Sequence, residues 1–433
     1  MAKTFSKIIL PAKGLEGEIK VPGDKSISHR AVILGSIADG KTEVTNFLPG
    51  EDNLRTVGAL SKMGAAIERP SPSTVIINGA GMRGLKEPDD FIDCGNSGTT
   101  ARLLTGLLSA QSFFSALTGD SSMRKRPMKR VVVPLTRMGA KITGRVSGEY
   151  LPLAITGGKL KGIIYSTPVP SAQLKSSLLL AGLYAEGETT IKEPQKSRDH
   201  TERMLKKFGA KVTSDGNKAS IKKTRALKAC NIDVPGDISS AAFFIVGALI
   251  TADSELLIKD VGVNPTRCGI LDILKKMRAD IEILNFKEGD EPKADLVVRS
   301  SRLKGVDIGG KELLPAIDEF PVLCVAAAFA EGVTNISGAG ELRVKESDRI
   351  SVMAEELTKI GVSVREKKDG IVIEGRGKKI KGGKVTSHGD HRVAMALAAA
   401  GLASDGGVEI EGADCVDVSF PGFFKELERV KKD

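Results

Sequence analysis

The pattern of hydrophobic and polar positions recurs six times along the chain, each time with the same order of segments. Each copy begins with polar residues and continues into an apolar segment rich in small residues, which predicts a buried helix; a glycine or polar break and a short alternating segment, which predicts a strand, then follow. Successive copies start roughly 70 to 80 residues apart, and such self-similarity indicates a repeat architecture. The copies begin near Ser26, Asn96, Ser171, Ser239, Asp318 and Asp390.

A second predicted helix in the repeat ends in a small-residue turn, as in Met63-Gly64-Ala65 and Phe208-Gly209-Ala210. A further strand and turn recur near Val75 to Gly79 and Val372 to Gly375. Together these segments predict six βαβαββ-type units that account for nearly the whole chain. The expected fold class is therefore α/β.

One tetrapeptide divides the six units into two groups of three. Val21-Pro22-Gly23-Asp24 recurs as Val234-Pro235-Gly236-Asp237, each time just before a repeat helix, and proline with glycine is typical of a linker. The last unit lacks its closing strands, whereas residues 7–21 supply strand pattern at the other end of the chain. We therefore expect one domain of three repeats at residues 23–235, and a second formed by residues 1–22 with 236–433.

Composition excludes several classes of protein. With 41% hydrophobic and 27% charged residues, the chain of 433 residues has the usual globular balance rather than that of a disordered chain. Its longest nearly apolar run, residues 241–250, is half of the roughly 20 residues that a membrane helix needs. The N-terminus has no apolar signal core, and the five cysteines include no C-x-x-C pair, so a reduced, cytoplasmic protein is expected.

The net charge of +10 raises the alternative of a nucleic-acid-binding protein. The chain has no Trp and three Tyr, which argues against a stacking platform for single strands. A nucleic-acid binder would show a strongly salt-dependent affinity for DNA or RNA, whereas an enzyme would prefer small substrates. Small anionic substrates therefore remain open.

Three familiar patterns lack the context that their chemistry needs. Residues 35–42 match a phosphate-binding loop, but a helix is expected before them and a strand after them, the reverse of the required order. Residues 79–84 match a dinucleotide fingerprint, but Pro88 blocks the helix that should follow. His388 and His391 lack a third ligand, so no metal site is expected.

Charged and polar residues are concentrated where the repeat helices begin. The starts of these helices present unpaired N–H groups and a partial positive charge, which suit bound phosphates and carboxylates. Helix capping is the alternative, and it explains Ser, Asn and Asp at these positions. It does not explain Lys25, Arg30 and Arg392, since cations there oppose the helix dipole. We therefore predict anion binding at these helix starts.

Two basic clusters occupy residues 123–128 and 343–349. If the second is helical, Lys345 and Arg349 share one face and Glu346 lies three residues before Arg349. A solvated charged surface is the alternative. Carboxylates close to several cations suit acid and base catalysis on an anionic substrate, and Asp318 with Glu346 is the leading pair.

Four segments together resemble the 5-enolpyruvylshikimate-3-phosphate (EPSP) synthase family: residues 22–30, 95–102, 342–349 and 389–395. The resemblance extends from about residue 10 to residue 428, and a subgroup of the family is marked by residues 126–128, 171–175, 198–202 and 264–267. It implies a two-domain inverse α/β barrel with its active site in the interdomain cleft. It also implies transfer of the enolpyruvyl group of phosphoenolpyruvate to the 5-hydroxyl of shikimate 3-phosphate in aromatic amino-acid biosynthesis, by a monomer without metal or organic cofactor.

The resemblance also implies residue roles. Asp318 would accept the proton of the 5-hydroxyl, Glu346 would donate a proton to the methylene carbon, and Lys25 would touch both substrates. Glyphosate would occupy the phosphoenolpyruvate pocket. The residues implied to bind shikimate 3-phosphate are Lys25, Ser26, Arg30, Ser171, Ala172, Gln173, Arg198, Asp318 and Lys345. Those implied to bind phosphoenolpyruvate are Lys25, Gly98, Arg126, Gln173, Arg349 and Arg392.

The nearest rival enzyme shares this fold and donor but transfers the group to UDP-N-acetylglucosamine. That family carries a cysteine on a mobile loop after the second repeat helix, and residues 112–130 contain none. The chain also departs from many EPSP synthases, because Val418 replaces a lysine and Ser122 an arginine.

Overall fold

The computed structural model describes residues 5–432, which follow the predicted order of elements. Within them the order strand, helix, strand, helix, strand, strand occurs five times, with extra short helices in some copies, and a sixth copy ends in a helix and one short strand. The predicted α/β repeat is therefore confirmed. The chain divides into two compact units, which we call the middle unit (residues 23–234) and the terminal unit (residues 1–22 and 235–433). No helix in the described part of the chain is long and apolar enough to cross a membrane.

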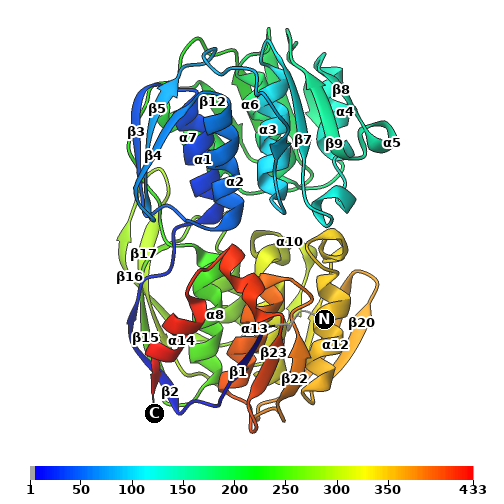
Figure 1. Ribbon diagram of the computed structural model, residues 1–433. Coiled ribbons are helices and arrows are strands. Elements are labelled where there is room, and N and C mark those ends of the chain that lie inside the picture. The colour runs from blue at the N-terminus through cyan, green and yellow to red at the C-terminus, as the bar shows by residue number, and fades with distance from the viewer. Residues whose placement is uncertain (1–4, 433) are drawn as a thin grey trace. The chain divides into compact units, whose positions relative to one another are not determined.

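The middle unit holds three repeats (Figure 1). Its elements are α1 (Lys25–Ser36), β3 (Asp39–Thr45), α2 (Glu51–Lys62), β4 (Ala66–Ser71), β5 (Thr74–Ala80), β6 (Ile92–Asp93), α3 (Gly98–Ser109), β7 (Phe114–Thr118), the 3₁₀ helix η1 (Met123–Lys125), α4 (Lys129–Arg137), β8 (Lys141–Gly144), α5 (Arg145–Gly148), β9 (Tyr150–Thr156), β10 (Ile164–Ser166), α6 (Ala172–Gly182), β11 (Glu188–Lys192), α7 (His200–Lys207), β12 (Val212–Asp215), β13 (Lys218–Lys222) and β14 (Ile232–Asp233).

Residues 23–234 form three four-stranded sheets with the orders β14-β3-β5-β4, β6-β7-β9-β8 and β10-β11-β13-β12. In each sheet the first two strands are parallel and the remaining pairs antiparallel. Strand β14 comes last in this unit yet pairs with β3, near its beginning. The pairing of β14 with β3 therefore closes the unit on itself.

The terminal unit holds the other three repeats. Its elements are β1 (Ser6–Ile9), β2 (Gly14–Ile19), α8 (Ile238–Ile250), β15 (Glu255–Gly262), α9 (Gly269–Lys276), β16 (Asp280–Lys287), β17 (Lys293–Arg299), β18 (Asp307–Ile308), α10 (Gly310–Leu313), η2 (Leu314–Glu319), α11 (Phe320–Phe329), β19 (Glu331–Ile336), η3 (Gly340–Val344), α12 (Arg349–Lys359), β20 (Ser363–Lys367), β21 (Gly370–Arg376), β22 (Gly383–Thr386), α13 (His391–Leu402), β23 (Val408–Glu411), η4 (Ala413–Val418), α14 (Phe423–Arg429) and β24 (Lys431–Lys432).

The first strands of the chain complete this unit. Strand β2 pairs with β15 in the sheet β16-β17-β15-β2-β24, and β1 pairs with β23 in the sheet β1-β23-β22. The strand pattern at residues 7–21 thus supplies two different sheets rather than one strand pair. The remaining sheet has the order β18-β19-β21-β20.

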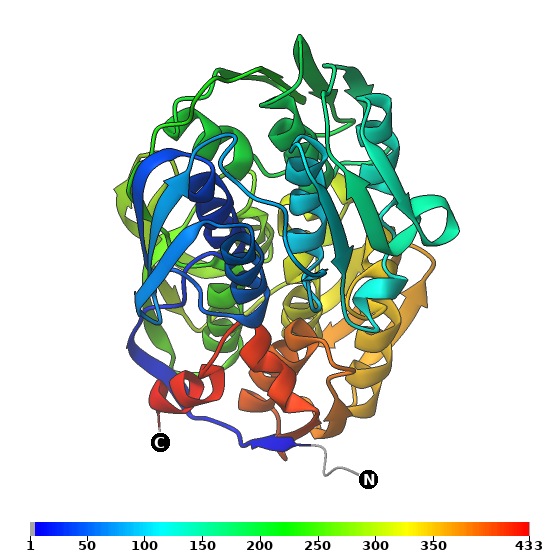
Figure 2. The ribbon, with the colours of Figure 1, turned by 45° about the horizontal axis from the view of Figure 1, so that its top comes forward.

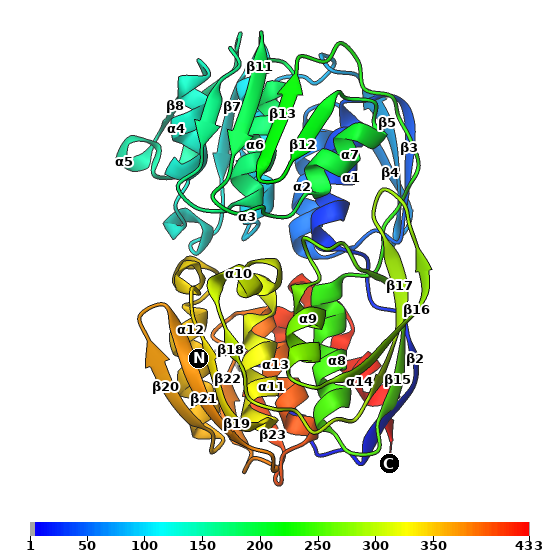
Figure 3. The ribbon, with the colours of Figure 1, turned by 180° about the vertical axis from the view of Figure 1, so that it is seen from behind.

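Each unit is built around three helices that are buried on nearly every face: α1, α3 and α6 in one, and α8, α11 and α13 in the other. Helices apolar all round are buried ones, and small residues let them approach closely. A methyl group on Gly106 of α3 would lie 2.1 Å from the carbonyl oxygen of Ser177 in α6. Figure 2 shows α1 in dark blue and α3 in cyan, and Figure 3 shows α8, α11 and α13 side by side.

Candidate active site

Three core helices of the middle unit begin at predicted site residues. Lys25 is the first residue of α1, Gly98 of α3 and Ala172 of α6. The preceding residues Asp24, Ser97 and Ser171 cap these helices by accepting the N–H of Ile27, Thr100 and Leu174. Capping and anion binding are therefore compatible, because a cap satisfies one N–H and leaves others of the first turn to face a ligand.

Lys25 and Arg30 are both fixed by contacts within the middle unit. Lys25 Nζ lies 3.2 Å from Asp52 Oδ2 of α2, and both side chains are largely buried. Arg30 donates from Nε to Thr201 Oγ1 at 2.6 Å and from Nη2 to Ser176 Oγ at 2.7 Å. Its Nη1 donates to the carbonyl oxygen of Ser26 at 2.8 Å. The structure thus joins Arg30 to Ser26, and the resemblance assigns both residues to shikimate 3-phosphate.

Gly98 faces two guanidinium groups. A methyl group added to Gly98 would lie 2.7 Å from Arg102 Nη1 and 3.1 Å from Arg126 Nη2. Arg126 also donates to the carbonyl oxygen of Asn96 at 3.2 Å. The structure therefore brings Gly98 and Arg126 together, as the predicted phosphoenolpyruvate site requires.

Arg102 is a residue that the sequence analysis left without a role. It donates to Gln173 Oε1 at 2.7 Å, and Gln173 in turn donates to Thr99 Oγ1 at 3.0 Å. These bonds join the starts of α3 and α6. The signal was present, because Arg102 lies four residues after Gly98 and hence on the same helix face.

Glu193 connects the segment that holds Ser171 and Ala172 to the segment that holds Arg198. Ser171 and Ala172 lie at the partly exposed start of α6, and Arg198 lies in the loop between β11 and α7. The backbone N–H groups of Ser171 and Ser197 donate to the two carboxylate oxygens of Glu193, at 3.1 and 3.2 Å. Arg198 is thereby placed close to the start of α6.

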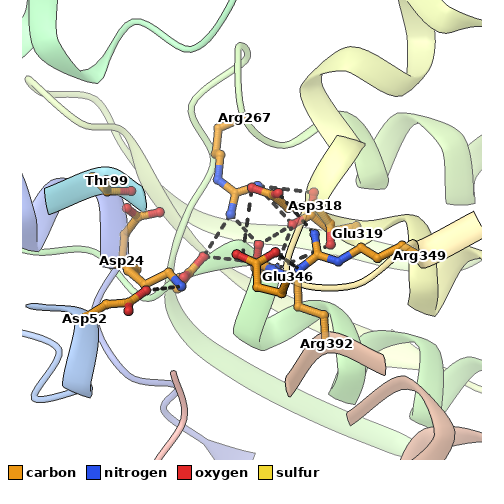
Figure 4. A network of polar contacts seen from close by, with 12 residues as sticks. Asp24, Asp52, Thr99, Arg267, Asp318, Glu319, Glu346, Arg349 and Arg392 are labelled. Carbon is orange, nitrogen blue, oxygen red and sulfur yellow. Dashed lines mark hydrogen bonds and ion pairs between the residues drawn. The ribbon is translucent and has the colours of Figure 1, made fainter. Parts of the chain in front are cut away.

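In the terminal unit, Arg349 interacts with the carboxylates of Asp318 and Glu346 (Figure 4) and with that of Asp390. Its Nε lies 2.8 Å from Asp390 Oδ2, its Nη2 lies 2.9 Å from Glu346 Oε2, and its Nη1 lies 3.7 Å from Asp318 Oδ1. Burial alone would lower the pKa of Arg349, but the charges of Asp390 and Glu346 raise it above its usual value. The predicted acid and base thus contact one permanently charged group.

Arg392 approaches the same carboxylate from another helix. It is the second residue of α13, and its Nη2 lies 3.9 Å from Asp318 Oδ2. Its Nη1 donates to the carbonyl oxygen of Asp318 at 3.4 Å and lies 3.8 Å from Glu319 Oε1. Asp318 therefore lies between two guanidinium groups (Figure 4).

The segment that carries Lys345 and Glu346 is not helical, so the condition for a shared helix face is not met. The 3₁₀ helix η3 ends at Val344 and α12 begins at Arg349. Asp348 caps α12 through the N–H groups of Ile350 and Ser351, which fixes where the helix starts. Burial lowers the pKa of Lys345 below 10.5, against the raising effects of Asp318 and Glu346.

Comparison with known proteins identifies the family of the chain. Residues 9–427 match the family model described as EPSP synthase (3-phosphoshikimate 1-carboxyvinyltransferase). The chain belongs to the EPSP synthase family. It is 56% identical over 424 residues to the 3-phosphoshikimate 1-carboxyvinyltransferase of Pelobacter propionicus, covering 98% of each chain. It is also 56% identical to the enzyme of the same name from Geobacter metallireducens, covering 98% of this chain and 99% of that one.

Solved structures agree with the EPSP synthase assignment. The EPSP synthase of Acinetobacter baumannii superposes with a TM-score of 0.88 at 49% identity, covering 98% of both chains. The enolpyruvyl transferase NikO of Streptomyces tendae superposes with a TM-score of 0.79 at 16% identity, over 99% of this chain and 97% of that one, a likeness of fold alone. The predicted family and fold class are therefore confirmed.

This EPSP synthase family member also contains a buried cluster that the sequence recorded only as a subgroup motif. Arg267 Nη1 lies 2.9 and 3.1 Å from the two carboxylate oxygens of Glu319 (Figure 4). Its Nη2 lies 3.2 Å from Asp237 Oδ1. Arg267 also hydrogen-bonds to Ser239. Because Glu319 follows Asp318 and approaches Arg392, this cluster supports the carboxylate and guanidinium groups of the site.

The motifs set aside in the sequence have structural roles. Residues 39–45 form strand β3 after helix α1, so the phosphate-loop pattern does not open a helix. His388 Nε2 lies 2.7 Å from Glu356 Oε1. Glu355, Glu356 and His388 lie close enough to hold an ion, but Lys359 Nζ lies 2.8 Å from both glutamates and compensates their charge. His391 is not part of that group, as the weak spacing signal suggested.

Proposed function

We propose that this chain is a 3-phosphoshikimate 1-carboxyvinyltransferase. It transfers the enolpyruvyl group of phosphoenolpyruvate to the 5-hydroxyl of shikimate 3-phosphate, giving 5-enolpyruvylshikimate 3-phosphate and phosphate in the shikimate pathway. The match of residues 9–427 to the family, with 56% identity to enzymes of that name, carries the proposal. The chemistry of the site supports it, because each substrate brings a phosphate and a carboxylate and the chain offers several fixed cations.

We assign the substrate groups to residues by the resemblance to the EPSP synthase family. Ser171, Ala172, Gln173 and Arg198 bind the 3-phosphate of shikimate 3-phosphate. Ser26 and Arg30 bind its carboxylate, Lys345 reaches the same molecule, and Lys25 touches both substrates. Phosphoenolpyruvate is bound by Gly98, Arg126, Gln173, Arg349 and Arg392. The supporting observation is that Arg30 holds Ser26, and that Gly98 lies against Arg126.

The reaction needs two proton transfers in opposite directions, which the two carboxylates supply. Asp318 accepts the proton of the 5-hydroxyl while the hydroxyl oxygen bonds to C2 of phosphoenolpyruvate. Glu346 donates a proton to the methylene carbon. The resulting tetrahedral intermediate then returns a proton from the new methyl group to the Glu346 carboxylate and expels phosphate, which takes up the proton held by Asp318. Arg349 and Arg392 hold the anionic charge in place throughout, which requires no reorganisation during the reaction.

We propose that residues of both units bind the substrates of this reaction. Cations suited to the substrates occur in each unit, Lys25 and Arg30 in the middle unit and Lys345 and Arg392 in the terminal unit. We further propose a cytoplasmic monomer that needs no metal or organic cofactor and binds no nucleic acid. Calorimetric affinity for shikimate 3-phosphate that falls on both Arg30→Ala and Lys345→Ala substitution would support a shared site, and an effect of only one would contradict it.

The deciding experiment measures phosphate released from phosphoenolpyruvate. We expect release that depends on added shikimate 3-phosphate, with none when UDP-N-acetylglucosamine replaces it. Asp318→Asn is the matched negative control, since it keeps the shape of the side chain and removes the proposed base. Release supported by UDP-N-acetylglucosamine but not by shikimate 3-phosphate would overturn the assignment.

A further inference from the structure

Glu193 is a buried carboxylate directly after β11, and the proposed mechanism gives it no role. Its Oε1 accepts the backbone N–H of Ser171 at 3.1 Å, and its Oε2 accepts the backbone N–H of Ser197 at 3.2 Å. Both of its oxygens are therefore engaged by backbone donors from segments that are far apart in the sequence. Hydrogen bonds to an ionised acceptor are shorter and stronger than those between neutral groups.

A buried lysine compensates the charge of this carboxylate. Lys175 Nζ of α6 lies 2.8 Å from Glu193 Oε2 and 2.9 Å from Glu202 Oε1 of α7. It also donates to the carbonyl oxygen of Ser197 at 3.2 Å. Buried charges persist only when paired in this way. The side chains of all three charged residues are at most 4% exposed, so their geometry is fixed by packing rather than by solvent.

The two segments held by Glu193 carry the proposed contacts to one substrate phosphate. Ser171 opens the segment Ser171–Gln173 at the start of α6, and Ser197 precedes Arg198 in the loop before α7. A shift of either segment changes the spacing between the helix start and the guanidinium group. Misplacement of a binding group by about 1 Å can cost a large part of its effect.

We propose that Glu193 is a positioning residue that sets the phosphate cradle of shikimate 3-phosphate by fixing the Ser171 and Ser197 backbone N–H groups. The proposal rests on the proposed function, which assigns that phosphate to Ser171, Gln173 and Arg198. It goes further by making affinity for this one substrate depend on a residue that does not touch it. The effect of Glu193 on phosphoenolpyruvate binding should be much smaller, because Gln173 alone among these residues is also assigned to that substrate.

Glu202 provides a matched control. It contacts the same buried ammonium at nearly the same distance, but from α7, whereas the Ser171 and Ser197 N–H groups both go to Glu193. Glu193→Gln and Glu202→Gln therefore remove the same charge from the same lysine. Both substitutions replace a carboxylate oxygen with an amide NH₂, but only at Glu193 do both oxygens accept a backbone N–H, which an NH₂ group cannot do.

The test compares the wild type, Glu193→Gln and Glu202→Gln by steady-state kinetics and by calorimetric titration with shikimate 3-phosphate alone. We expect Glu193→Gln to raise KM and Kd for shikimate 3-phosphate about tenfold, the effect of losing a hydrogen bond to a charged group, with KM for phosphoenolpyruvate changed by less than about twofold. Glu202→Gln should lower the melting temperature similarly while leaving both KM values within about twofold of wild type.

Equal effects of the two variants on shikimate 3-phosphate, or equal effects of Glu193→Gln on both substrates, would overturn the proposal. If Glu193→Gln does not fold, Glu193→Asp decides, because it keeps the charge on Lys175 but is one methylene too short to reach both N–H groups. Glu193→Asp with wild-type affinity for shikimate 3-phosphate would then refute positioning. A wild-type protein that neither binds shikimate 3-phosphate nor uses it would instead refute the proposed function.

Discussion

Arg349 donates a 2.9 Å hydrogen bond from Nη2 to Oε2 of Glu346, three residues before it. The same guanidinium donates from Nε to Asp390 Oδ2 at 2.8 Å, and the Arg349 side chain is only 1% exposed. The buried carboxylate of Asp390 also accepts from Nη2 at 3.3 Å, so Nη2 is shared between Asp390 and Glu346, the carboxylate that we propose as the proton donor. In the proposed mechanism, Arg349 therefore both binds phosphoenolpyruvate and orients the acid.

Replacement of Glu346 by Gln should slow the chemical step while leaving substrate binding nearly intact. The amide oxygen can still accept the hydrogen bond from Arg349, but the amide cannot deliver a proton to carbon. We expect kcat to fall by about 10²- to 10⁴-fold, the usual contribution of general acid catalysis. Pre-steady-state measurement of intermediate formation checks this, with the exposed Glu355→Gln as control. A variant with near-normal kcat would remove Glu346 from the role of acid.

Lys345 should make shikimate 3-phosphate binding sensitive to alkaline pH. The protonated lysine binds the anion, and burial lowers its pKa below 10.5, so the charge is lost at a lower pH than for an ordinary lysine. Affinity should therefore be complete at neutral pH and decline as pH rises through the lowered pKa. We expect kcat/KM for shikimate 3-phosphate to fall on the alkaline side in the wild type.

Lys345→Arg supplies the matched variant for this pH profile. Arginine stays protonated across the accessible range, so the alkaline decline should move to higher pH even if the absolute affinity is lower. Profiles of kcat/KM recorded from neutral to alkaline pH compare the two proteins. An identical alkaline limb in both would show that another group controls binding.

The repeat architecture could be predicted from the sequence because it depends on local pattern. Helices such as α8 and α11 are apolar on every side, and glycine with proline punctuates the chain at Val21 to Asp24 and again at Val234 to Asp237. Which strands pair with one another could not be predicted in this way. The pairing of β14 with β3, and of β1 with β23, joins segments near opposite ends of each unit, which no local pattern records.

The supporting residues of the site were missed for a related reason. Asp390 contacts Arg349 from 41 residues away, and Arg267 contacts Glu319 from 52 residues away. Neither separation matches a helix or strand period, so composition and spacing carry no sign of the pair. The resemblance implies roles for the proposed substrate-binding residues. Arg102 and Arg267, which lie within its motifs, and Glu193, which lies outside them, acquire a role only once the helices are packed.

Arg267 should be coupled energetically to Glu319. Both side chains are buried, and Arg267→Met leaves Glu319 without its main partner, so we expect a loss of about 3 to 5 kcal/mol in the free energy of unfolding. The double variant Arg267→Met/Glu319→Gln removes the stranded charge and should recover part of that loss. Urea unfolding of the wild type, both single variants and the double variant forms the cycle. Strictly additive effects would contradict the coupling.

Gly98→Ala should weaken glyphosate more than phosphoenolpyruvate. The added methyl group would lie 2.7 Å from Arg102 Nη1 and 3.1 Å from Arg126 Nη2, so these guanidinium groups must shift and the space beside the start of α3 becomes smaller. Glyphosate, which is longer than phosphoenolpyruvate, needs more of that space. We expect the ratio of the glyphosate inhibition constant to KM for phosphoenolpyruvate to rise. Thr105→Ala, also on α3 but buried away from the helix start, is the control, and an unchanged ratio in Gly98→Ala would refute the steric explanation.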